Sequence, residues 1–247
     1  MAVVTGGAGG MGKAICMGLA QAGYAVVAGY NSSQAAARAL VARLPPAARP
    51  HVALLAPVTD SAGLRALAAD VAQRYGRCDL LVNCAGTTRF VPHADLDGLE
   101  DALIDQILAT NVRGPFAAVR AFKALLAAPR TDGASGLVVN ISSIAAVTAM
   151  GSNVVYCASK AALDNMTKSL ARALAPAIRV LSVSPGLADT EFVQRMDSAW
   201  RDEQASRTPL KRLAQPEEVA AAVVAAASHL RFTTGAVIPV DGGRQLT

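Results

Sequence analysis

Short apolar runs that alternate with longer helical patterns constrain this chain more than any other feature of its sequence. The runs are rich in β-branched residues and lie at 2–5, 24–29, 51–55, 79–83, 136–142, 178–184 and 236–240. Several are apolar without polar alternation, which is typical of strands buried on both faces of a sheet. Helical patterns between them cover 11–22, 33–44, 61–75, 97–128, 153–175 and 216–228. This order predicts a parallel sheet of about seven strands with helices on both faces.

Right-handed crossovers between such strands give a doubly wound, Rossmann-like α/β fold. The sequence shows no internal repeat and no linker rich in Pro, Gly or Ser, so we expect one domain over residues 1–247. The pattern at 97–128 predicts two helices that break near Gly114-Pro115. The segment 186–215 is irregular, and long loops inside compact domains are usually functional.

Composition excludes several other classes of protein. With 53% hydrophobic residues the chain is too apolar to be disordered, and four scattered cysteines are too few for a disulfide-stapled domain. Its longest apolar run, at 220–227, is far shorter than the roughly 20 residues that span a bilayer. The chain shows no secretory signal and no zinc-ligand spacing. We therefore expect a cytoplasmic protein without a membrane segment or a metal site.

A glycine-rich turn, TGGAGGMG, links the first predicted strand to the first predicted helix. Gly6, Gly10 and Gly12 would let the backbone approach a phosphate without a Cβ atom in the way. The helix that begins near Met11 would direct free N–H groups and the positive end of its dipole at that phosphate. Glycines alone are a weak signal, and a tight turn without a ligand is the alternative. Their position between strand and helix favours a dinucleotide site.

The end of the second strand is expected to contact the adenosine ribose. An NAD site carries an acidic residue there, but no Asp or Glu precedes Asp60 in this chain. Tyr30, Asn31 and Ser32 offer polar groups where the next helix opens, and such groups could hold a 2′-phosphate. Arg38 could contribute, although no arginine lies within the glycine turn. These residues favour NADP(H), with NAD(H) as the alternative.

Tyr156 and Lys160 lie four residues apart in a predicted helix, and therefore on one helix face. A neighbouring ammonium lowers the pKa of a tyrosine, which could then exchange a proton with a carbonyl or an alcohol. Ser143 comes thirteen residues earlier, just past a strand, at the edge where open sheets bind ligands. Its hydroxyl could hydrogen-bond a substrate oxygen as charge develops there. Ser142 is the competing candidate, but the spacing favours Ser143.

Together these motifs resemble the short-chain dehydrogenases/reductases, in particular members similar to 3-oxoacyl-acyl-carrier-protein reductases. The resemblance covers essentially the whole chain. It rests on motifs in the family order, namely Thr5-Gly6-x3-Gly10-x-Gly12, Asn83-Cys84-Ala85-Gly86, Asn111, Ser143, Tyr156-x3-Lys160, Ser184-Pro185-Gly186 and the segment 235–243.

The resemblance implies a role for each of these positions. Tyr156 would be the general acid/base, and Lys160 would lower its pKa and hydrogen-bond the nicotinamide ribose. Ser143 would polarise the substrate carbonyl, and Asn111 would hold a water of the proton relay. For Asn83 a purely structural role is as plausible as a cofactor contact. The full cofactor-binding set is Gly6, Gly10, Met11, Gly12, Tyr30, Asn31, Ser32, Val58, Asn83, Ala85, Gly86, Tyr156, Lys160, Pro185, Gly186 and Thr190.

Two segments depart from the family pattern. Pro57 stands before Val58, where relatives often carry an Asp or Asn that bonds the adenine amino group, and proline offers no such donor or acceptor. The segment 174–180 carries few of the basic residues with which carrier-protein reductases dock their partner. The adenine contact must therefore come from elsewhere, and docking of an acyl-carrier protein stays open.

The leading hypothesis is NADPH-dependent reduction of a ketone, of 3-oxoacyl type or another small carbonyl, to a secondary alcohol. An NAD-dependent secondary-alcohol dehydrogenase is the first alternative. A non-catalytic dinucleotide sensor is less favoured, because a sensor would be expected to lose Tyr156 or Lys160. A nucleic-acid partner is not expected, since the longest basic cluster is Lys211-Arg212 and Trp200 is the single tryptophan.

The segment 186–215 is expected to cover the substrate. It could form an apolar wall with basic rims for a ketone with an acid or thioester tail, or a solvated amphipathic helix. Its candidate residues are Phe192, Met196, Trp200, Arg195, Arg201, Arg207 and Arg212.

A homo-oligomer, dimer or tetramer, is expected through the helices at 97–128 and 153–175. Small residues that would allow close approach there are Ala117, Ala118, Ala121, Ala158, Ala161 and Ala162. Residues 1–59 carry four basic side chains and no carboxylate, so most of the net charge of +5 lies in the half expected to bind a dinucleotide.

Overall fold

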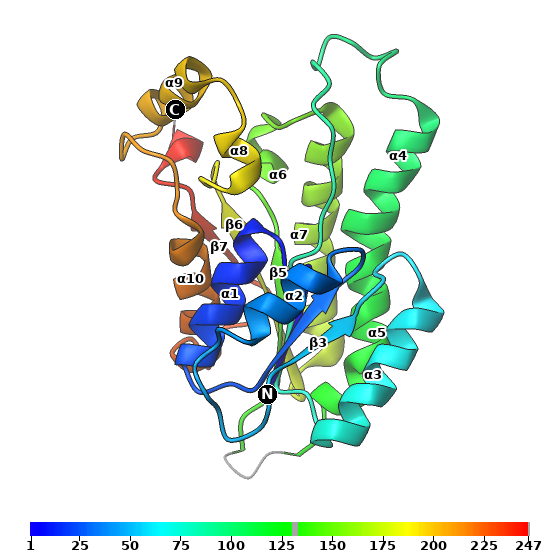
Figure 1. Cartoon of the computed structure of the whole chain (residues 1–247). Coiled ribbons are helices and arrows are strands. Elements are labelled where there is room, and N and C mark those ends of the chain that lie inside the picture. Colours follow the sequence, from blue (N-terminus) through cyan, green and yellow to red (C-terminus); the bar gives the residue numbers. More distant parts are fainter. Residues whose placement is uncertain (130–132, 247) are drawn as a thin grey trace.

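Seven parallel strands form a single sheet in the computed structural model, which describes residues 1–129 and 133–246 (Figure 1). The strands are β1 (Ala2–Thr5), β2 (Val26–Tyr30), β3 (Val52–Leu55), β4 (Leu80–Asn83), β5 (Gly136–Ile141), β6 (Ile178–Pro185) and β7 (Val237–Val240). Their order is β3-β2-β1-β4-β5-β6-β7, and every pairing is parallel. This confirms the predicted doubly wound, Rossmann-like sheet.

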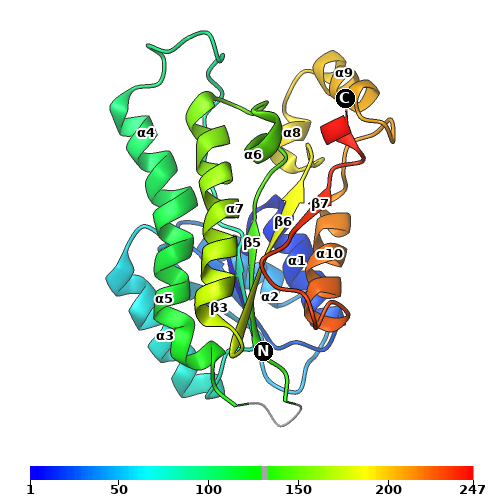
Figure 2. The ribbon, with the colours of Figure 1, turned by 180° about the vertical axis from the view of Figure 1, so that it is seen from behind.

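Helices cover both faces of the sheet, as Figure 2 shows from behind. On one face lie α1 (Gly10–Gln21), α2 (Gln34–Val41) and α10 (Pro216–Ser228). On the other lie α3 (Ser61–Tyr75), α5 (Gly114–Leu126) and α7 (Val154–Leu174), while α4 (Asp101–Leu108) packs against α7. The helices bury apolar stripes against the strands, which is why the sheet residues themselves need no polar alternation.

Local signals explain where several of these helices begin and end. The Asp60 side chain accepts a hydrogen bond from Ala62 N at the start of α3, and Gly76 ends the helix in a left-handed conformation with φ of 74°. Helix α10 opens with Pro216 and with a capping box between Gln215 and Glu218. Both helices have the bounds that the sequence predicts.

The two helices expected within 97–128 do meet at Gly114-Pro115, but their junction is a change of helix type rather than a gap. The chain passes from α4 through a π-helical turn, Ala109–Arg113, directly into α5, and Pro115 occupies the first turn of α5. Pro115 has no N–H to donate to the helical turn before it, and the π-helical turn lies directly ahead of this proline. The π-helical turn contains one extra residue per turn, and Asn111 lies within it.

The segment 186–215 is also more regular than expected. It contains α8 (Glu191–Gln194) and α9 (Ser198–Arg207), and a parallel bridge pairs Ala188 with Ala214 at its base. Two short elements complete the described chain, α6 (Ala145–Thr148) and a 3-10 turn at Arg244–Leu246. No helix within residues 1–129 and 133–246 is long and apolar enough to cross a membrane.

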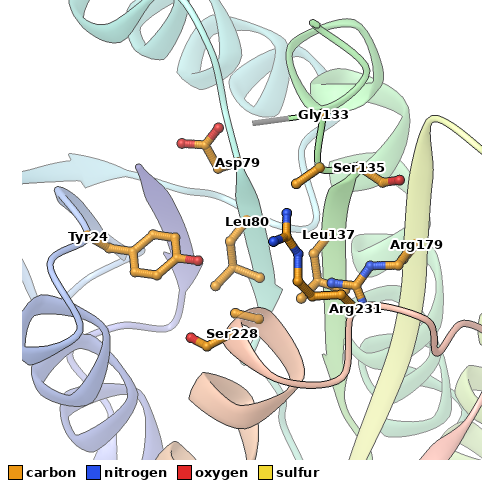
Figure 3. Close-up of a pocket in the computed structure, with 11 residues that line it drawn as sticks. Tyr24, Asp79, Leu80, Gly133, Ser135, Leu137, Arg179, Ser228 and Arg231 are labelled. Carbon is orange, nitrogen blue, oxygen red and sulfur yellow. The ribbon is translucent and has the colours of Figure 1, made fainter. Parts of the chain in front are cut away.

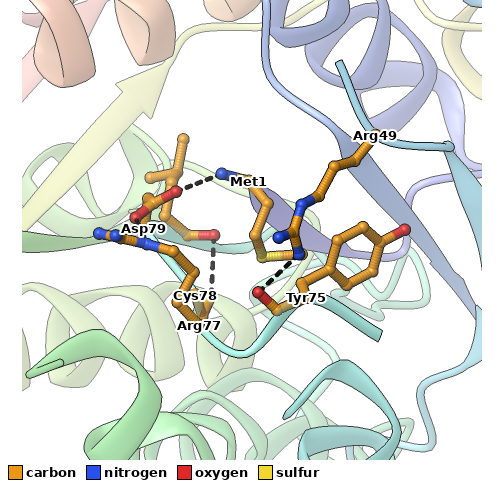
Figure 4. A network of polar contacts seen from close by, with 7 residues as sticks. Met1, Arg49, Tyr75, Arg77, Cys78 and Asp79 are labelled. Atoms are coloured by element: carbon orange, nitrogen blue, oxygen red, sulfur yellow. Dashed lines mark hydrogen bonds and ion pairs between the residues drawn. The ribbon is translucent and has the colours of Figure 1, made fainter. Parts of the chain in front are cut away.

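Polar contacts close the amino edge of the sheet (Figure 4). The Met1 amino group pairs with Asp79, whose second oxygen accepts a 2.6 Å hydrogen bond from Arg77 Nε. Arg49 Nη1 donates to Tyr75 O at 2.8 Å. Arg49, one of the four basic residues of 1–59, therefore contributes its charge to the amino edge rather than to the edge where a dinucleotide is expected.

Candidate active site

The strand order reverses between β1 and β4, and the carboxyl ends of these two strands form the topological switch point. The glycine-rich turn follows β1, and Asn83-Cys84-Ala85-Gly86 ends β4. Thr5 Oγ1 joins them by accepting hydrogen bonds from Cys84 N at 3.1 Å and Ala85 N at 3.2 Å. Gly6 has φ of +64°, and a Cβ there would lie 2.9 Å from the Ala85 Cα. The two segments thus touch only because Gly6 carries no side chain.

The first turn of α1 fits a phosphate group. A Cβ at Gly12 would collide with the Gly6 carbonyl oxygen, so glycine is required for this close turn. Gly9, which precedes the helix, supplies no side-chain cap, and the first turn contains no acidic residue. The N–H groups there consequently have no side-chain acceptor, and the dipole favours an anion beside them. Met11 lies half-buried within this turn.

Strand β2 ends at Tyr30, and Asn31 and Ser32 follow it at the carboxyl edge of the sheet. Tyr30 is half-buried, while Asn31 and Ser32 are exposed, and the first turn of α2 that follows contains no acidic residue. Val58 follows β3, the strand beside β2, and a Cβ added to Gly114 would be 3.2 Å from the Val58 Cβ. None of these four side chains at the carboxyl edge carries a carboxylate.

Helix α7 carries Tyr156 and Lys160 on its face toward the sheet. The Asn153 side chain caps the helix by accepting from Tyr156 N at 2.7 Å, and its Nδ2 donates to Arg89 O at 2.7 Å. Lys160 is buried, its Nζ donates to Ile141 O at 2.8 Å, and Nζ lies 5.7 Å from the centroid of the Tyr156 ring. The capping asparagine and the end of β5 therefore fix both side chains.

Burial is the largest cause of the pKa shifts of Tyr156 and Lys160. Burial raises the pKa of Tyr156 and a hydrogen bond from Ser143 partly opposes it. Burial lowers the pKa of Lys160 to about 8. In the cofactor-free protein the Lys160 ammonium donates to Ile141 O rather than to the phenol, and the effect of Lys160 on the pKa of Tyr156 stays a prediction. A raised pKa keeps Tyr156 a protonated phenol at neutral pH.

Ser143 and Ser142 point in different directions. Ser143 is half-buried, hydrogen-bonds Tyr156 and accepts from Ala145 N at 3.2 Å. Ser142 is buried, and its hydroxyl donates to Lys160 O at 3.5 Å. Of the two, Ser143 is the serine beside the phenol.

Asn111 links the π-helical turn to the loop after β4. Its Oδ1 accepts from Thr87 N at 2.9 Å, and its Nδ2 donates to Thr87 O at 3.0 Å and to Ser159 Oγ at 3.1 Å. A Cβ at Gly86 would lie 3.5 Å from Asn111 Oδ1 and 3.8 Å from Lys160 Nζ. Gly86, Asn111 and Lys160 therefore surround one small space that the missing side chain of Gly86 leaves open.

Asn83 turns its amide into the sheet. Its Nδ2 donates to Asn140 Oδ1 at 2.9 Å, and Asn140 Nδ2 donates to Thr167 Oγ1 at 2.8 Å. The buried Oδ1 of Asn83 has no hydrogen-bond partner among the described residues. These contacts give Asn83 a structural role between β4 and β5.

The residues after β6 pack over the glycine turn. Pro185 is buried at the end of β6, and a Cβ at Gly186 would lie 3.1 Å from the Asp241 Cα. A Cβ at Gly10 would lie 2.8 Å from Thr190 Cβ, so Thr190 sits directly on the start of α1. Lys13 Nζ and Glu191 Oε1 pair at 2.6 Å beside it. The base of the segment 186–215 and the glycine turn thus form one wall of the site.

The remaining expectations have mixed outcomes. Ala117 and Ala118 are buried in the core beneath α5, so they cannot line a surface between subunits, whereas Ala158, Ala161 and Ala162 are exposed on α7. Helix α9 buries none of its residues, although Trp200 is half-buried. The side chain of Phe192 lies outside the described part of the structure.

Sequence reasoning missed a buried polar network behind the site. Asn140 in β5, Ser182 in β6 and Thr167 in α7 are completely buried, and Thr167 Oγ1 lies 2.9 Å from Ser182 Oγ. Asp164 is buried beside them, and the nearby Ser142 and Ser182 hydroxyl groups act on the pKa of its carboxyl. Isolated polar residues inside otherwise apolar strands, such as Asn140, are the signal that could have revealed it.

A cavity of about 340 Å³ lies away from this site, at the amino ends of β4 and β5 (Figure 3). Tyr24, Ser135, Arg179 and Arg231 are among its lining residues. Arg179 Nη1 donates to Leu230 O at 2.8 Å and to Thr233 O at 3.0 Å. Arg179 therefore holds the segment that follows α10 by these two hydrogen bonds. It is not part of the arrangement around Tyr156.

Known proteins are similar to this chain in sequence and in fold. The family described as Enoyl-(Acyl carrier protein) reductase matches residues 6–245. The 3-oxoacyl-[acyl-carrier-protein] reductase FabG of Thermotoga maritima is 35% identical over 246 residues, which cover 98% of this chain and 96% of the relative. The crystal structure of a Burkholderia xenovorans protein described as a short-chain dehydrogenase/reductase has a TM-score of 0.92 at 35% identity, covering 100% of this chain and 98% of that chain. The Pseudomonas aeruginosa RhlG/NADP active-site complex has a TM-score of 0.90 at 30% identity, covering 99% and 95%. The chain belongs to the short-chain dehydrogenase/reductase family, of which it resembles the 3-oxoacyl-acyl-carrier-protein reductases.

Proposed function

We propose that this protein reduces a ketone to a secondary alcohol with NADPH and that Tyr156 is the general acid. The observation that carries the proposal is the convergence of Tyr156, Lys160 and Ser143 at the carboxyl edge of the sheet, beside an α1 N-terminus without a side-chain cap. Catalytic hydroxyl groups and a phosphate-binding turn at one switch point are what hydride transfer to a carbonyl requires.

The cofactor, when bound, supplies the hydride. The residues that would hold it lie at or after the carboxyl ends of five strands and at the start of α7. The glycine turn would receive the diphosphate, the end of β2 the adenosine ribose, and the space at Gly86 and Lys160 the nicotinamide ribose. The proposed set is Gly6, Gly10, Met11, Gly12, Tyr30, Asn31, Ser32, Val58, Asn83, Ala85, Gly86, Tyr156, Lys160, Pro185, Gly186 and Thr190.

The chain itself orients the carbonyl and provides the proton. Ser143 and Tyr156 lie side by side, so both hydroxyl groups can donate to one carbonyl oxygen and fix its position. The raised pKa of Tyr156 keeps its proton in place until negative charge develops on that oxygen. Lys160 supplies a positive charge close to the ring, which stabilises the phenolate left behind. Asn111 is the proposed next group in the proton relay.

The preference for NADPH over NADH rests on the residues at the end of β2. A carboxylate there would repel a 2′-phosphate and bind a ribose hydroxyl, and residues 1–59 contain none. The P. aeruginosa relative is seen with NADP, which supports the same choice. An NAD-dependent dehydrogenase is the second candidate, because the glycine turn lacks an arginine.

The proposed substrate class is a 3-oxoacyl thioester or another small ketone. The T. maritima relative is named as a reductase of 3-oxoacyl groups on acyl-carrier protein, which supports the thioester. The few basic residues between 174 and 180 argue against the same docking mode for a carrier protein here.

The test is to follow NADPH oxidation with a panel of ketones, 3-oxoacyl thioesters included, and to measure the Kd of NADPH and NADH. We expect turnover of at least one ketone and tighter binding of NADPH. Asn31→Asp should reverse the cofactor preference, and Gln73→Glu, at the exposed end of α3, is the control for the change of charge. Tighter NADH binding by the wild type would reject the NADPH assignment, and absence of turnover across the panel would reject the substrate class.

A further inference from the structure

Asp164 is the carboxylate nearest in sequence to the catalytic lysine, and the established family motifs do not include it. It follows Lys160 by four residues in α7, so both side chains lie on the helix face that packs against the sheet. Lys160 is 6% exposed and Asp164 is 8% exposed. A lone charge is costly at such depth, and two opposite charges one helical turn apart compensate each other.

The groups around the two side chains single out Asp164 as the countercharge. The titratable groups that act on Lys160 are the Cys84 thiol at the end of β4 and Asp164. Burial raises the pKa of Cys84 to about 11, so this thiol is neutral at physiological pH. The Tyr156 phenol, a turn earlier on α7, is also neutral there, because burial raises its pKa. Asp164 is thus the one carboxylate among the described residues that is found to act on the charge of Lys160.

The Asp164 carboxyl is buried on the side of α7 that faces the sheet. Burial raises its pKa, while the neighbouring Ser142 and Ser182 hydroxyl groups and the charges of Lys160 and Lys168 oppose that rise. Ser142 follows β5 and donates to Lys160 O, and Ser182 lies in β6 beside Thr167. The buried Oδ1 of Asp164 accepts no hydrogen bond, so its charge is available to the neighbouring ammonium.

We propose that Asp164 is a positioning residue of the active site, whose carboxylate keeps Lys160 a cation one helical turn away. The inference rests on the proposed function, since it names what sustains the charge that Tyr156 needs. Without the carboxylate, burial alone would act on Lys160, and its ammonium would lose a proton at lower pH. Tyr156 would then lose its cationic neighbour in the pH range where the enzyme works.

The first test is a titration of the cofactor-free protein and does not depend on activity. Lysine labelled with ¹³C at Cε reports the protonation of Lys160 by NMR, and Lys160→Met identifies its resonance. We expect a midpoint near 8 in the wild type and a midpoint lower by about one unit in Asp164→Asn. Asp164→Leu is a second neutral variant that fills the same buried space should Asn impair folding. Asp164→Glu, which keeps the charge, should recover most of the shift.

The second test is the pH dependence of kcat/KM for ketone reduction. The limb on the basic side should move to lower pH by the same amount in both neutral variants. The matched control is Asp70→Asn, which removes one carboxylate from the exposed Arg74–Asp70 pair on α3 and should leave the limb in place. An unchanged Lys160 midpoint in both neutral variants would overturn the proposal. If the wild type reduces no ketone, the proposed function fails, while the titration still decides whether Asp164 sustains the charge.

Discussion

At the residue scale, Lys160 shows how burial and charge compete in this site. The side chain reaches the end of β5 and donates to Ile141 O, which places a cation where water is excluded. Burial lowers the pKa of Lys160 to about 8, well below its usual range. A sequence reveals that a lysine lies one turn from a tyrosine, but the depth of both groups depends on the fold.

This shift should appear in the stability of the protein. Between pH 8 and 10 the unfolded chain keeps a proton on Lys160 that the folded protein releases, so this group makes folding more favourable as pH rises. From pH 7.5 to 9.5 the wild type should gain roughly 1–2 kcal/mol of unfolding free energy relative to Lys160→Met. The cysteines titrate in both proteins and cancel in the difference. Urea denaturation at the two pH values measures it, and equal pH dependence would contradict the buried cation.

At the element scale, the sequence predicted the regular parts well. Helices α3 and α10 have their predicted bounds because apolar period, cap and proline all agree there. The π-helical turn around Asn111 was not predicted, since one extra residue barely disturbs a helical pattern. The network of Asn140, Thr167 and Asp164 was also missed, because contacts between elements far apart in the chain produce no regular spacing of residues in the sequence. Site motifs were visible because they follow strand ends, whereas their electrostatics needed the packing.

Helix α9 is the element whose function most needs a test. It has no buried residue, while α8 at the base of the same segment is joined to α1 by the Lys13–Glu191 pair. Elements with few buried contacts open at low cost, which suits a cover over a substrate. We expect Trp200→Ala to change the order of kcat/KM among ketones and to leave the Kd of NADPH unchanged. Glu203→Gln on the same helix is the control, and an unaltered order in Trp200→Ala would exclude α9 from substrate binding.

At the scale of the whole molecule, α4, α5 and α7 form the outer layer on one side of the sheet (Figure 2). Phe116 on α5 and Val154 on α7 are 43% and 42% exposed, and the exposed alanines of α7 leave room for a second helix layer.

The basic residues of 1–59 contribute less positive charge to the expected dinucleotide site than the sequence suggested. Lys13 is paired with Glu191 and Arg49 lies at the amino edge, which leaves Arg38 on α2 as the first basic residue in sequence after β2.

The exposed apolar side chains on α5 and α7 predict a homo-oligomer. Sedimentation velocity of the wild type should show a dimer or tetramer, and Phe116→Asp combined with Ala161→Arg should lower its mass, because both changes place charge in the apolar contact. Leu55→Asp, at the exposed end of β3, is the control and should not dissociate the assembly. A monomeric wild type would contradict this prediction.

The central claim is that Tyr156 gives its proton to a ketone beside a bound dinucleotide. Its most direct test compares the wild type with Tyr156→Phe, a change that removes one oxygen atom from a side chain fixed by the Asn153 cap. We expect kcat for NADPH-dependent ketone reduction to fall by about 10²–10⁴ while the Kd of NADPH stays within a few-fold. Wild-type turnover by Tyr156→Phe would contradict it.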